Sequence, residues 1–426
     1  MSPRSLSVRQ ADARVLVLAG GEGRRLLPLT QAQTKGAVSF AGMYRLIDFT
    51  LSNCLHSGLS RIAVLVQHNY ASLERHLRLA WGIFRPELGS CLEIVPPPPQ
   101  AAETGYRGTA DAVYQSLGRL GGAAPRHVLV LASDHVYRMD YRQLLGYHLR
   151  RGADLTIACT EVEQEQAHRF GILEVDAARR IVGFVEKPQR PGGLLLRPGV
   201  ALASMDVYVL DTRVLKDVLR ADARRPDSAH DFGRDVIPAM VSGGRRVWAY
   251  DVGEEVSRDY YWRDIGTLDA YWEASMELLG AAPPLDPRDP EWPVHSFHPG
   301  LPDAQVVVED RLEARVEAAL LCPGVQVTGA RVARSILGLD VTVDPRAEVV
   351  ESVLMEGVHV GPGARIHRAI VDQGVRIPAG ARVGSGRQEG LPVSPGGITV
   401  VPRGAARLRD AGTAAPCRLA AAGSSP

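Results

Sequence analysis

Short apolar runs alternate with stretches of helical periodicity over residues 14–275. The runs are continuous, as buried strands of a parallel sheet are, and they occupy residues 15–19, 62–67 and 128–132. Amphipathic patterns typical of helices occupy residues 46–57, 72–79 and 110–120. Four prolines at 96–99 exclude a helix or a central strand and predict a loop. The alternation predicts an α/β domain with a doubly wound, mostly parallel sheet, in which ligands bind beyond the carboxyl ends of the strands.

The hydrophobic period changes after a proline-rich stretch at residues 283–302. Apolar residues then recur every five or six positions, at Val327, Val332, Leu337, Val343, Val349, Leu354, Val360, Ile366, Val371, Ile377 and Val383. A spacing near six predicts a parallel β-helix built from hexapeptide repeats. A β-sandwich is the alternative, but it would show turn signals about every 8–12 residues. A short strand at residues 398–401 is also predicted.

These patterns divide the chain into four parts. We expect an α/β domain over residues 14–282, a linker over 283–312, the β-helix over 313–410 and a disordered tail over 411–426. A length of 426 residues suits two or three domains of ordinary size.

The composition excludes several classes of protein. Lys and Arg total 49 against 48 for Asp and Glu, so the net charge of +1 gives no general attraction to nucleic acid or acidic lipid. No apolar run approaches the ~18 residues of a transmembrane helix, and the first residues, MSPRSLSVRQADAR, contain no apolar core of a secretory signal. Five cysteines without C-x-x-C spacing argue against a disulfide scaffold or a zinc site. We therefore expect a soluble cytoplasmic protein with no nucleic-acid or membrane partner.

Lysine is rare in this chain. The 49 basic residues include only three lysines, Lys35, Lys187 and Lys216. A lysine that remains where arginine is otherwise used is a candidate for a site that needs a compact ammonium and cannot fit a planar guanidinium. Chance retention is the alternative for each lysine taken alone.

The first segment with candidate chemistry is LAGGEGRRLLPLT, residues 18–30. Its glycines follow a buried strand and let backbone N–H groups approach a phosphate, while Arg25 adds charge. The segment is not a Rossmann loop, because Leu26 stands where the third glycine would be, and no Gly-Lys-Ser/Thr of a P-loop occurs. Although the loop alone is weak evidence, it predicts a phosphate site of another kind.

Three further segments place charged residues at predicted strand ends or turns. Asp134, in SDHVYRMDY, directly follows a predicted buried strand, where a carboxylate can hold Mg²⁺. A helix N-cap is the common alternative for such an aspartate. In FVEKP, Glu186 can accept hydrogen bonds from sugar hydroxyls and Lys187 can meet a phosphate, although a surface ion pair would give the same pattern. In YWRDIGT, Asp264 is another acid beside aromatic residues.

In this order the segments resemble the ADP-glucose pyrophosphorylase (glucose-1-phosphate adenylyltransferase) family of the sugar-nucleotidyltransferase group. The resemblance covers residues 14–410 through GGEGRRLLPLT, YRLIDFTLSNC, YRGTADAVYQS, SDHVYRMDY, FGILEVD, IVGFVEKP, ALASMDVYVL, HDFGRDVIP and YWRDIGTLDAYW. It implies a left-handed hexapeptide β-helix as the second domain. It also implies an enzyme that transfers the adenylyl group of ATP to glucose 1-phosphate, giving ADP-glucose and pyrophosphate for glycogen or α-glucan synthesis. Mg²⁺, a homotetramer and allosteric control are further implications.

The resemblance also implies roles for individual residues. Asp134 and Asp264 match the metal carboxylates, and Asp134 is catalytic together with Arg25 and Lys35, which handle the triphosphate. Lys187 matches the lysine that binds the phosphate of glucose 1-phosphate. The positions implied to bind substrate are Gly20, Gly21, Gly23, Tyr106, Gly108, Asp134, Gly171, Glu186, Lys187, Ser204 and Asp231. Two of the three lysines therefore fall on family ligand positions.

The chain departs from the family pattern beside the expected site. Gly36 stands where the usual R-A-K-P has proline, Ser133 stands where a GDH triplet has glycine, and Gly105 replaces a tryptophan. Ser133 adds a side chain beside the metal position, and we expect this to affect efficiency more than chemistry.

Three other functions stay open. A catalytically weak regulatory paralogue is disfavoured, because such chains tend to lose the ligands that Asp134, Asp264, Lys187 and Arg25 supply here. Another sugar 1-phosphate or nucleotide is compatible with the motifs, since isosteric sugars differ by only a few hydrogen bonds. A hexapeptide acyltransferase would use His359 or His367 as a base, and we expect both at exposed corners.

Regulation is where the chain departs most from the family. Family enzymes commonly respond to sugar phosphates and to adenylates or orthophosphate, and anions of this kind need several converging cations. Cations of the best-characterised branch are replaced here by Ala32, Gln33, Ser39, Gly122 and Gln373, whereas Arg45, Arg403 and Arg407 remain. We therefore expect a weak response to such effectors.

Overall fold

The computed structural model describes residues 13–101, 104–118, 125–190, 195–257, 260–308, 312–384 and 390–405. The chain divides into two compact units. The α/β unit comprises the segments up to Val38, Tyr44–Gly266 and Leu285–Phe297, and the β-helix unit comprises Ser39–Met43, Thr267–Pro284 and the segments from His298 onward. The predicted tail at 411–426, and the positions Gly122 and Arg407, lie outside the described residues.

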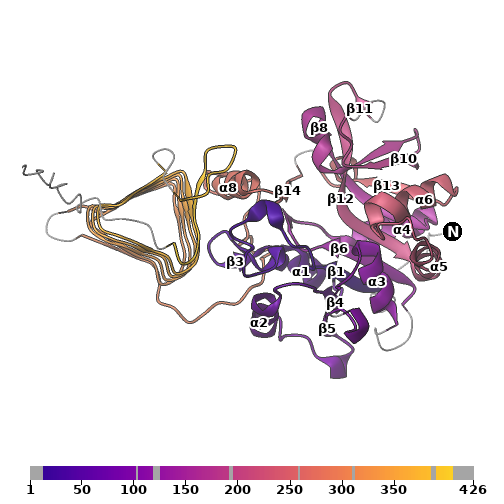
Figure 1. Ribbon diagram of the computed structural model, residues 1–426, viewed down its shortest axis with the longest axis horizontal. Helices are drawn as coiled ribbons and strands as arrows, with labels where there is room; N and C mark the ends of the chain where they lie inside the picture. The colour runs from indigo at the N-terminus through magenta and orange to yellow at the C-terminus, as the bar shows by residue number, and fades with distance from the viewer. Residues whose placement is uncertain are drawn as a thin grey trace, which may run out of the picture. The chain divides into compact units, whose positions relative to one another are not determined.

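A ten-stranded mixed sheet forms the centre of the α/β unit (Figure 1). Its strands are β1 (Ala13–Leu18), β4 (Arg61–Leu65), β5 (Cys91–Val95), β6 (His127–Ala132), β8 (Leu155–Glu163), β9 (Gly171–Val175), β10 (Ile181–Glu186), β11 (Leu195–Arg197), β12 (Val200–Asp211) and β13 (Val247–Asp251). The path β6-β1-β4-β5 is parallel throughout. The long strand β12 is antiparallel to β6, β8 and β9, so the other half of the sheet is mainly antiparallel.

Helices cover both faces of this sheet. They are α1 (Leu46–His56), α2 (Ala71–Ala80), α3 (Thr109–Leu117), α4 (Tyr141–Arg151), α5 (Thr212–Ala223), α6 (Ile237–Ser242) and α7 (Val252–Glu255). Val15 and Val17 of β1 join a core that includes residues of α1, α2 and α4, while Leu16 joins a second core with residues of α3, α5 and α6. Alternate residues of one strand are thus buried on opposite faces, which explains why the strand reads as a continuous apolar run.

Short strands and single-turn helices lie between the longer elements. The short strands are β2 (Ser39–Phe40), β3 (Tyr44–Arg45), β7 (His135–Tyr137) and β14 (Trp262–Asp264). The 3₁₀ helices are η2 (Arg24–Leu26), η3 (Lys35–Ala37), η4 (Pro86–Leu88), η5 (Pro99–Ala101) and η6 (Gln164–Arg169), and η7 (Phe232–Val236) is a π-helix. The last of the four clustered prolines therefore begins a single 3₁₀ turn, in the first position of a helix where proline is tolerated.

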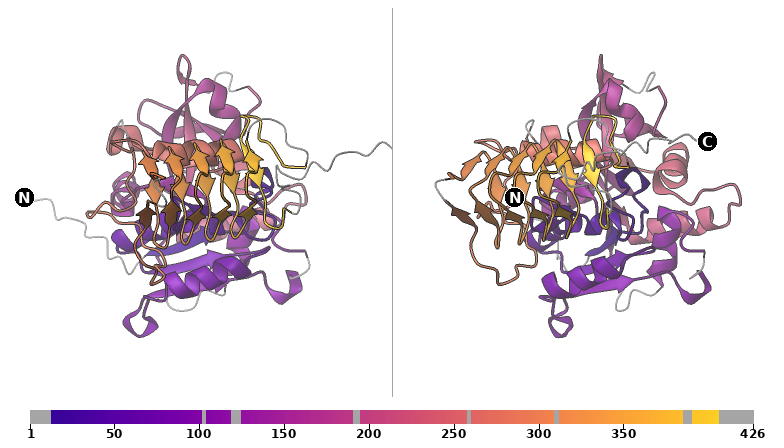
Figure 2. Two further views of the ribbon diagram at one scale, coloured as in Figure 1. Left: turned by 90° about the vertical axis from the view of Figure 1, so that its left-hand side faces the viewer. Right: turned by 60° about the vertical axis from the view of Figure 1, so that its left-hand side comes forward.

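Three five-stranded parallel sheets form the β-helix (Figures 1 and 2). The first contains β15 (Gln305–Val307), β18 (Gln326–Thr328), β21 (Thr342–Val343), β24 (His359–Val360) and β27 (Arg376–Ile377). The second contains β16 (Arg315–Glu317), β19 (Arg331–Ala333), β22 (Glu348–Val350), β25 (Arg365–His367) and β28 (Arg382–Val383). The third contains β17 (Leu320–Leu321), β20 (Ile336–Leu337), β23 (Val353–Leu354), β26 (Ala369–Val371) and β29 (Thr399–Val401).

The core of this β-helix confirms the six-residue period. All of the apolar positions predicted from Val327 to Val383 are buried in one cluster. Corners between the strands include left-handed backbone, for example at Gly363 with φ of +67°, which glycine adopts without steric cost. The fold class predicted from the sequence, an α/β domain with a hexapeptide β-helix, is confirmed, but the sheet of the α/β domain is mixed and not mostly parallel, because β12 pairs antiparallel with its neighbours.

The two compact units group some segments differently from the predicted domains, whose boundaries stay predictions. Helix α8 (Leu268–Glu277), which we expected in the first domain, belongs to the β-helix unit. Its Trp272 donates through Nε1 to the carbonyl of Glu351 at 2.8 Å, and Arg368 lies 4.6 Å over the Trp272 ring. The first strand of the β-helix begins at Gln305, inside the segment that we expected to be a linker. The hydrophobic periodicity of a segment does not predict which distant segments it will contact, so these contacts could not be predicted from it.

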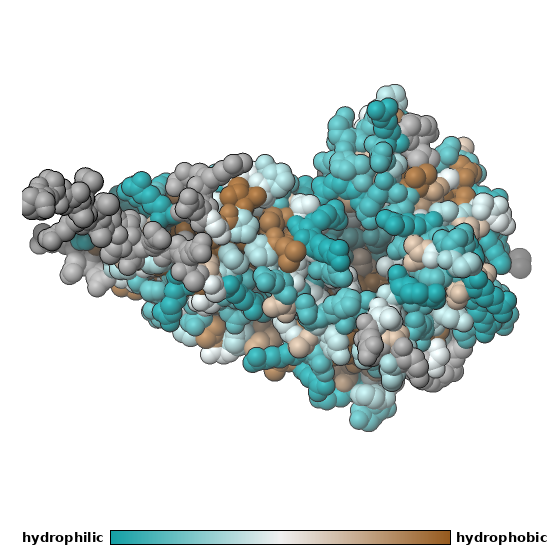
Figure 3. All heavy atoms as spheres, in the orientation of Figure 1, coloured by the Kyte–Doolittle hydropathy of each residue, from teal (hydrophilic) through white to brown (hydrophobic). Residues whose placement is uncertain are grey.

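The exposed surface is mostly hydrophilic on the face that Figure 3 shows. Within the described residues, no helix is both long and apolar enough to cross a bilayer.

His148 of α4 is a buried titratable group far from any predicted site. Its Nδ1 lies 2.9 Å from Oγ1 of Thr156, and its ring packs edge-on against His127 at 5.3 Å. Burial, with a smaller contribution from His127, lowers the pKa of His148 to about 3. At a pH below the ordinary histidine pKa of about 6.5, His148 therefore binds a proton in the unfolded chain but not in the folded chain.

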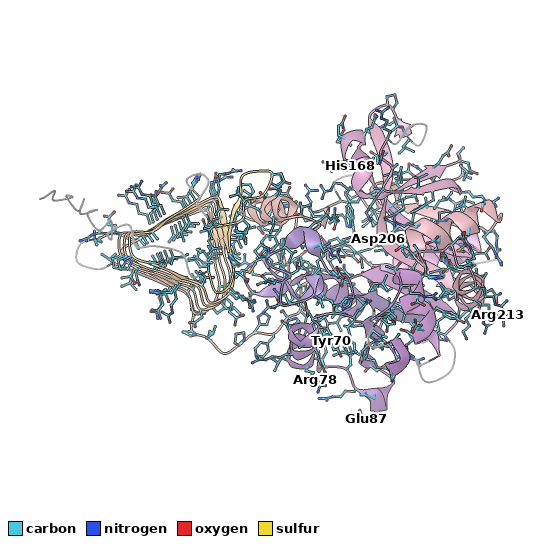
Figure 4. All side chains as sticks on the ribbon, in the orientation of Figure 1. Tyr70, Arg78, Glu87, His168, Asp206 and Arg213 are labelled. Carbon is cyan, nitrogen blue, oxygen red and sulfur yellow. The ribbon has the colours of Figure 1, made fainter. Side chains whose placement is uncertain are left out.

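This difference predicts a loss of stability in mild acid. Between pH 6.5 and pH 5, His148 should lower the free energy of unfolding by about 2 kcal/mol. His148→Asn keeps a polar group near Thr156 but does not titrate, so urea midpoints measured across this range should fall less steeply in the variant. His168→Asn, which replaces an exposed histidine (Figure 4), is the matched control and should keep the wild-type slope. Parallel pH profiles for wild type and His148→Asn would contradict this account.

Candidate active site

The glycine loop follows β1 and turns back at Gly23. Gly23 has φ of +62°, and a Cβ placed on it would lie 2.9 Å from Cγ2 of Thr30. The Thr30 hydroxyl donates to the carbonyl of Gly23 at 2.9 Å and fixes the turn. Only glycine fits this position, so Gly23 shapes the loop, whereas Gly20 and Gly21 line the adjacent cavity.

A cavity of about 370 Å³ lies at the carboxyl ends of β1, β4 and β6. This is the edge of the sheet at which the α/β pattern predicts ligand binding. Nine of the residues that we predicted for the site line this cavity, namely Gly20, Gly21, Lys35, Tyr106, Gly108, Asp134, Glu186, Lys187 and Asp231.

Three charged side chains meet at one end of this site. The Lys35 ammonium contacts Oδ2 of Asp134 and lies 3.2 Å from Oδ1 of Asp264. Their side chains are 13%, 22% and 10% exposed, respectively, so water screens the contact poorly. Asp264 does not line the cavity itself but joins the site through Lys35.

The carboxylates and the ammonium hold one another in their charged forms. Burial alone would raise the pKa of Asp134, but the Lys35 ammonium outweighs it and lowers the pKa to about 2. Burial alone would lower the pKa of Lys35, but Asp134 and Asp264 together raise it. Asp134, His135 and Asp264 also offer donor atoms that all lie within 4.8 Å of one another, as a divalent ion requires.

Strand pairing explains how Asp134 and Asp264 come together. Asp134 lies between β6 and β7, and Asp264 ends β14. β7 and β14 pair antiparallel, with His135 opposite Asp264. Residues about 130 positions apart therefore become neighbours through this two-stranded pairing.

Glu186 and Lys187 form the other charged pair of the cavity. Lys187 Nζ lies 2.6 Å from Oε1 of Glu186, and Lys187 has a left-handed backbone with φ of +48°. Burial would lower the pKa of Lys187, but the Glu186 carboxylate outweighs it and raises the pKa, so the ammonium keeps its charge. A Cβ on Gly171 or on Gly233 would fall 2.8 Å or 2.4 Å from Oε2 of Glu186. These two glycines make room for the carboxylate.

Asp231 and Ser204 are two further predicted residues, of which only Asp231 lines the cavity. Asp231 caps η7 by accepting hydrogen bonds from the N–H groups of Gly233 and Arg234, and it also accepts one from the Thr109 hydroxyl at 2.9 Å. Ser204 is buried beneath the cavity wall, 3.4 Å from the hydroxyl of Tyr208. Neither Ser204 nor Gly171 lines the cavity, although both adjoin residues that do.

Arg25 lies at the edge of the site. Its side chain is exposed, and its Nη2 would be 3.3 Å from a Cβ placed on Gly266. That same Cβ would be 2.7 Å from Oδ2 of Asp264, which locates Arg25 beside the carboxylate cluster.

The two departures at Gly36 and Ser133 face each other. A Cβ on Gly36 would lie 3.1 Å from Oγ and 3.3 Å from Cβ of Ser133. The missing side chain at one position therefore leaves the space that the added side chain at the other occupies. Gly36 and Ser133 therefore pack together, which explains why both departures from the family pattern occur in the same chain.

The sequence analysis missed Asp206, which lines the cavity from β12 (Figure 4). Asp206 has φ of +52° at a bulge where the register of β12 against β8 shifts. Its carboxylate accepts a hydrogen bond from the Tyr208 hydroxyl at 2.7 Å. A charged residue in the apolar run ALASMDVYVL was the signal available in the sequence.

Comparisons with known proteins identify the family of each domain. A family model described as "Nucleotidyl transferase" matches residues 14–280, and one described as "GlmU-like, C-terminal hexapeptide" matches residues 302–401.

Curated relatives match most of the chain. The glucose-1-phosphate adenylyltransferase of Rhodopirellula baltica is 44% identical over 340 residues, which cover 78% of this chain and 76% of the relative. Enzymes of the same name are 43% identical in Saccharophagus degradans, over 81% of this chain and 82% of the relative, and 44% identical in Granulibacter bethesdensis, over 75% and 78%. The nucleotidyl transferase model matches more than half of this chain, and the relatives match three quarters of it or more. The chain therefore belongs to the glucose-1-phosphate adenylyltransferase family.

Proposed function

We propose that this protein transfers the adenylyl group of ATP to glucose 1-phosphate and releases pyrophosphate. The observation that carries the proposal is one cavity lined by two charged groups, Lys35 with Asp134, which Asp264 adjoins, and Lys187 with Glu186. Two phosphorylated substrates need two such sites. The names of the relatives support ATP and glucose 1-phosphate as the pair.

The reaction needs no nucleophile from the protein. A phosphate oxygen of glucose 1-phosphate attacks the α-phosphorus of ATP, and the bond from that phosphorus to the oxygen bridging to the β-phosphate breaks. Catalysis then consists of positioning and of neutralising charge on the phosphate oxygens. We assign Lys187 to the attacking phosphate and Glu186 to the glucose hydroxyls. Lys35, Arg25 and the amides of the glycine loop are assigned to the departing pyrophosphate.

We propose Mg²⁺ as the cofactor. Asp134 and Asp264 supply the carboxylate oxygens that Mg²⁺ prefers, and both lie in one buried cluster. When bound, the ion would neutralise charge on the α-phosphate and on the leaving group. Lys35, which holds the two carboxylates together, is then available for the phosphates.

A catalytically weak paralogue would lack some of these groups, whereas this chain has all of them. We place the enzyme in the cytoplasm, since none of the four cysteines that the structure describes forms a disulfide bond. The weak response to effectors implied by the replaced cations also stays a prediction.

Removing the charge of Asp134 should abolish most of the activity. Asp134→Asn keeps the size of the side chain, and we expect kcat for pyrophosphate release from ATP and glucose 1-phosphate to fall by about 100-fold or more. Asp217→Asn, in a side chain that is 65% exposed on α5, is the matched control and should be unaffected. Near-normal turnover of a folded Asp134→Asn protein would remove this carboxylate from the mechanism.

Replacing Lys187 should weaken the binding of glucose 1-phosphate but not that of ATP. Lys187→Gln should raise the KM for glucose 1-phosphate by about tenfold or more while changing the KM for ATP little, because the ammonium is assigned to the sugar phosphate. Lys187→Arg should also be poor, since a planar guanidinium does not replace a point charge beside Glu186. Lys216→Gln, at the third lysine of the chain, serves as the control. Equal increases in both KM values would show that the assignment is wrong.

We also propose a homotetramer. The first strand of the β-helix, β15, is exposed along its length, and Val306, Val307 and Val308 are 48%, 43% and 64% exposed. An exposed apolar strand at a sheet edge favours association. Light scattering at micromolar concentration should give about four times the chain mass of 46.0 kDa. A 46.0-kDa species would contradict the assembly.

A further inference from the structure

His135 faces the two carboxylates from the adjacent strand. The pairing of β7 with β14 places His135 directly opposite Asp264. Residues opposite each other in an antiparallel pair project to the same side. Nε2 of His135 lies 3.8 Å from Oδ1 of Asp134 and 3.8 Å from Oδ1 of Asp264. The backbone register therefore directs this imidazole at the carboxylate cluster.

The protein does not satisfy the polar atoms of this imidazole. His135 is only 4% exposed, and its Nδ1 has no hydrogen-bond partner among the residues that the structure describes. The distances of 3.8 Å from Nε2 are too long for hydrogen bonds. The ring is held by edge-on aromatic contacts instead, with Trp262 at 5.2 Å and Tyr137 at 6.5 Å. Nε2, the nitrogen that faces the carboxylates, therefore lies close to both of them without a hydrogen bond to either.

The available oxygen atoms fit a shared cation. Lys35 contacts Asp134 through Oδ2, which leaves Oδ1 on the side of His135. Oδ1 of Asp264 faces both Lys35, at 3.2 Å, and His135, so an ion there would share this oxygen with the ammonium or displace it. Two donor atoms that share one ion lie about 3.0–3.6 Å apart when the bonds are about 2.0–2.2 Å long. All three donor atoms lie within 4.8 Å of one another, and a contraction of this cluster around an ion would bring His135 Nε2 and both carboxylates into one coordination sphere.

We propose that Nε2 of His135 is a third protein ligand of the divalent ion when that ion is Mn²⁺ or Co²⁺. Imidazole suits transition metals, whereas Mg²⁺ prefers oxygen ligands. His135 thus makes the site favour Mn²⁺ and Co²⁺ more strongly than two carboxylates alone would. The inference rests on the proposed function only in taking Asp134 and Asp264 as the metal site.

Electron spin-echo spectroscopy of bound Mn²⁺ tests the bond directly, without turnover. Protein labelled with ¹⁵N only in its histidines separates an imidazole ligand from the amine of Lys35. With Mn²⁺ alone added, the wild-type protein should show ¹⁵N coupling from a directly bound histidine. His168→Gln, at an exposed histidine of the same unit, should keep that coupling.

Two substitutions separate ligation from packing. His135→Phe keeps an aromatic ring against Trp262, and His135→Gln keeps a polar side chain, but neither has an imidazole nitrogen. Both should lose the ¹⁵N coupling and bind Mn²⁺ more weakly by about tenfold or more, measured by titration of the free-ion signal. Mg²⁺ affinity, measured by competition, should change by less than about threefold, because its oxygen ligands are retained.

The outcomes distinguish this inference from the function on which it rests. Tight Mn²⁺ binding without histidine coupling in the wild-type protein would overturn the ligand assignment and leave the adenylyltransferase proposal intact. An equal loss of Mn²⁺ and Mg²⁺ affinity in both variants would show a packing role and would also overturn it. Mn²⁺ binding that is unchanged in Asp134→Asn would place the ion elsewhere, and both proposals would then fail.

Discussion

The Lys35 ammonium between Asp134 and Asp264 is the contact on which the site depends. Two largely buried carboxylates this close would repel each other without a cation. Removing the Lys35 ammonium alone would leave both carboxylates unpaired and would destabilise the folded protein. The same arrangement presents two hard oxygen ligands and one cation to a polyphosphate. Stability before substrate binding and charge neutralisation during the reaction therefore come from the same three side chains.

Helix α1 holds the strands that carry this cluster. The Thr50 hydroxyl donates to the carbonyl of Ala132 at 2.9 Å, just before Ser133 and Asp134. Asn53 donates to the carbonyl of Tyr137 and accepts from the indole of Trp292 at 2.9 Å. Trp292 lies in the segment that returns to the α/β unit after α8. Buried hydrogen bonds of this kind fix the ends of β6 and β7, and with them the position of Asp134.

The sequence was sufficient for features with a local or periodic signal. The apolar runs predicted the parallel strands, and the spacing near six predicted the β-helix core from Val327 to Val383. Both patterns follow from the regular geometry of a single strand or of a single β-helix coil, so they are visible in the local sequence. Asp134 and Lys187 were predicted as site residues, and both line the cavity. Of the three lysines that the composition singled out, Lys35 and Lys187 line the cavity and Lys216 does not. Their roles come from the family resemblance and stay predictions.

Features that depend on distant pairs could not be read from local patterns. The approach of His135 to Asp264 depends on the β7–β14 register, and that of Gly36 to Ser133 on the packing of η3 against the end of β6. Ser133 looked like a defect when read alone, but it fills the space beside Gly36. Asp206 enters the cavity through a bulge with positive φ, which the surrounding apolar run conceals. The assignment of α8 to the β-helix unit likewise depends on tertiary contacts of Trp272.

Phosphorus-31 NMR of the purified protein with ATP, glucose 1-phosphate and Mg²⁺ tests the central claim most directly. If the two charged ends of the cavity position an attack on the α-phosphorus, the spectrum should show pyrophosphate together with the pair of diphosphate resonances of ADP-glucose, formed in equal amounts. Formation of ADP with a newly phosphorylated sugar would mean attack at the γ-phosphorus instead. That result, or no turnover by the folded protein, would contradict the account.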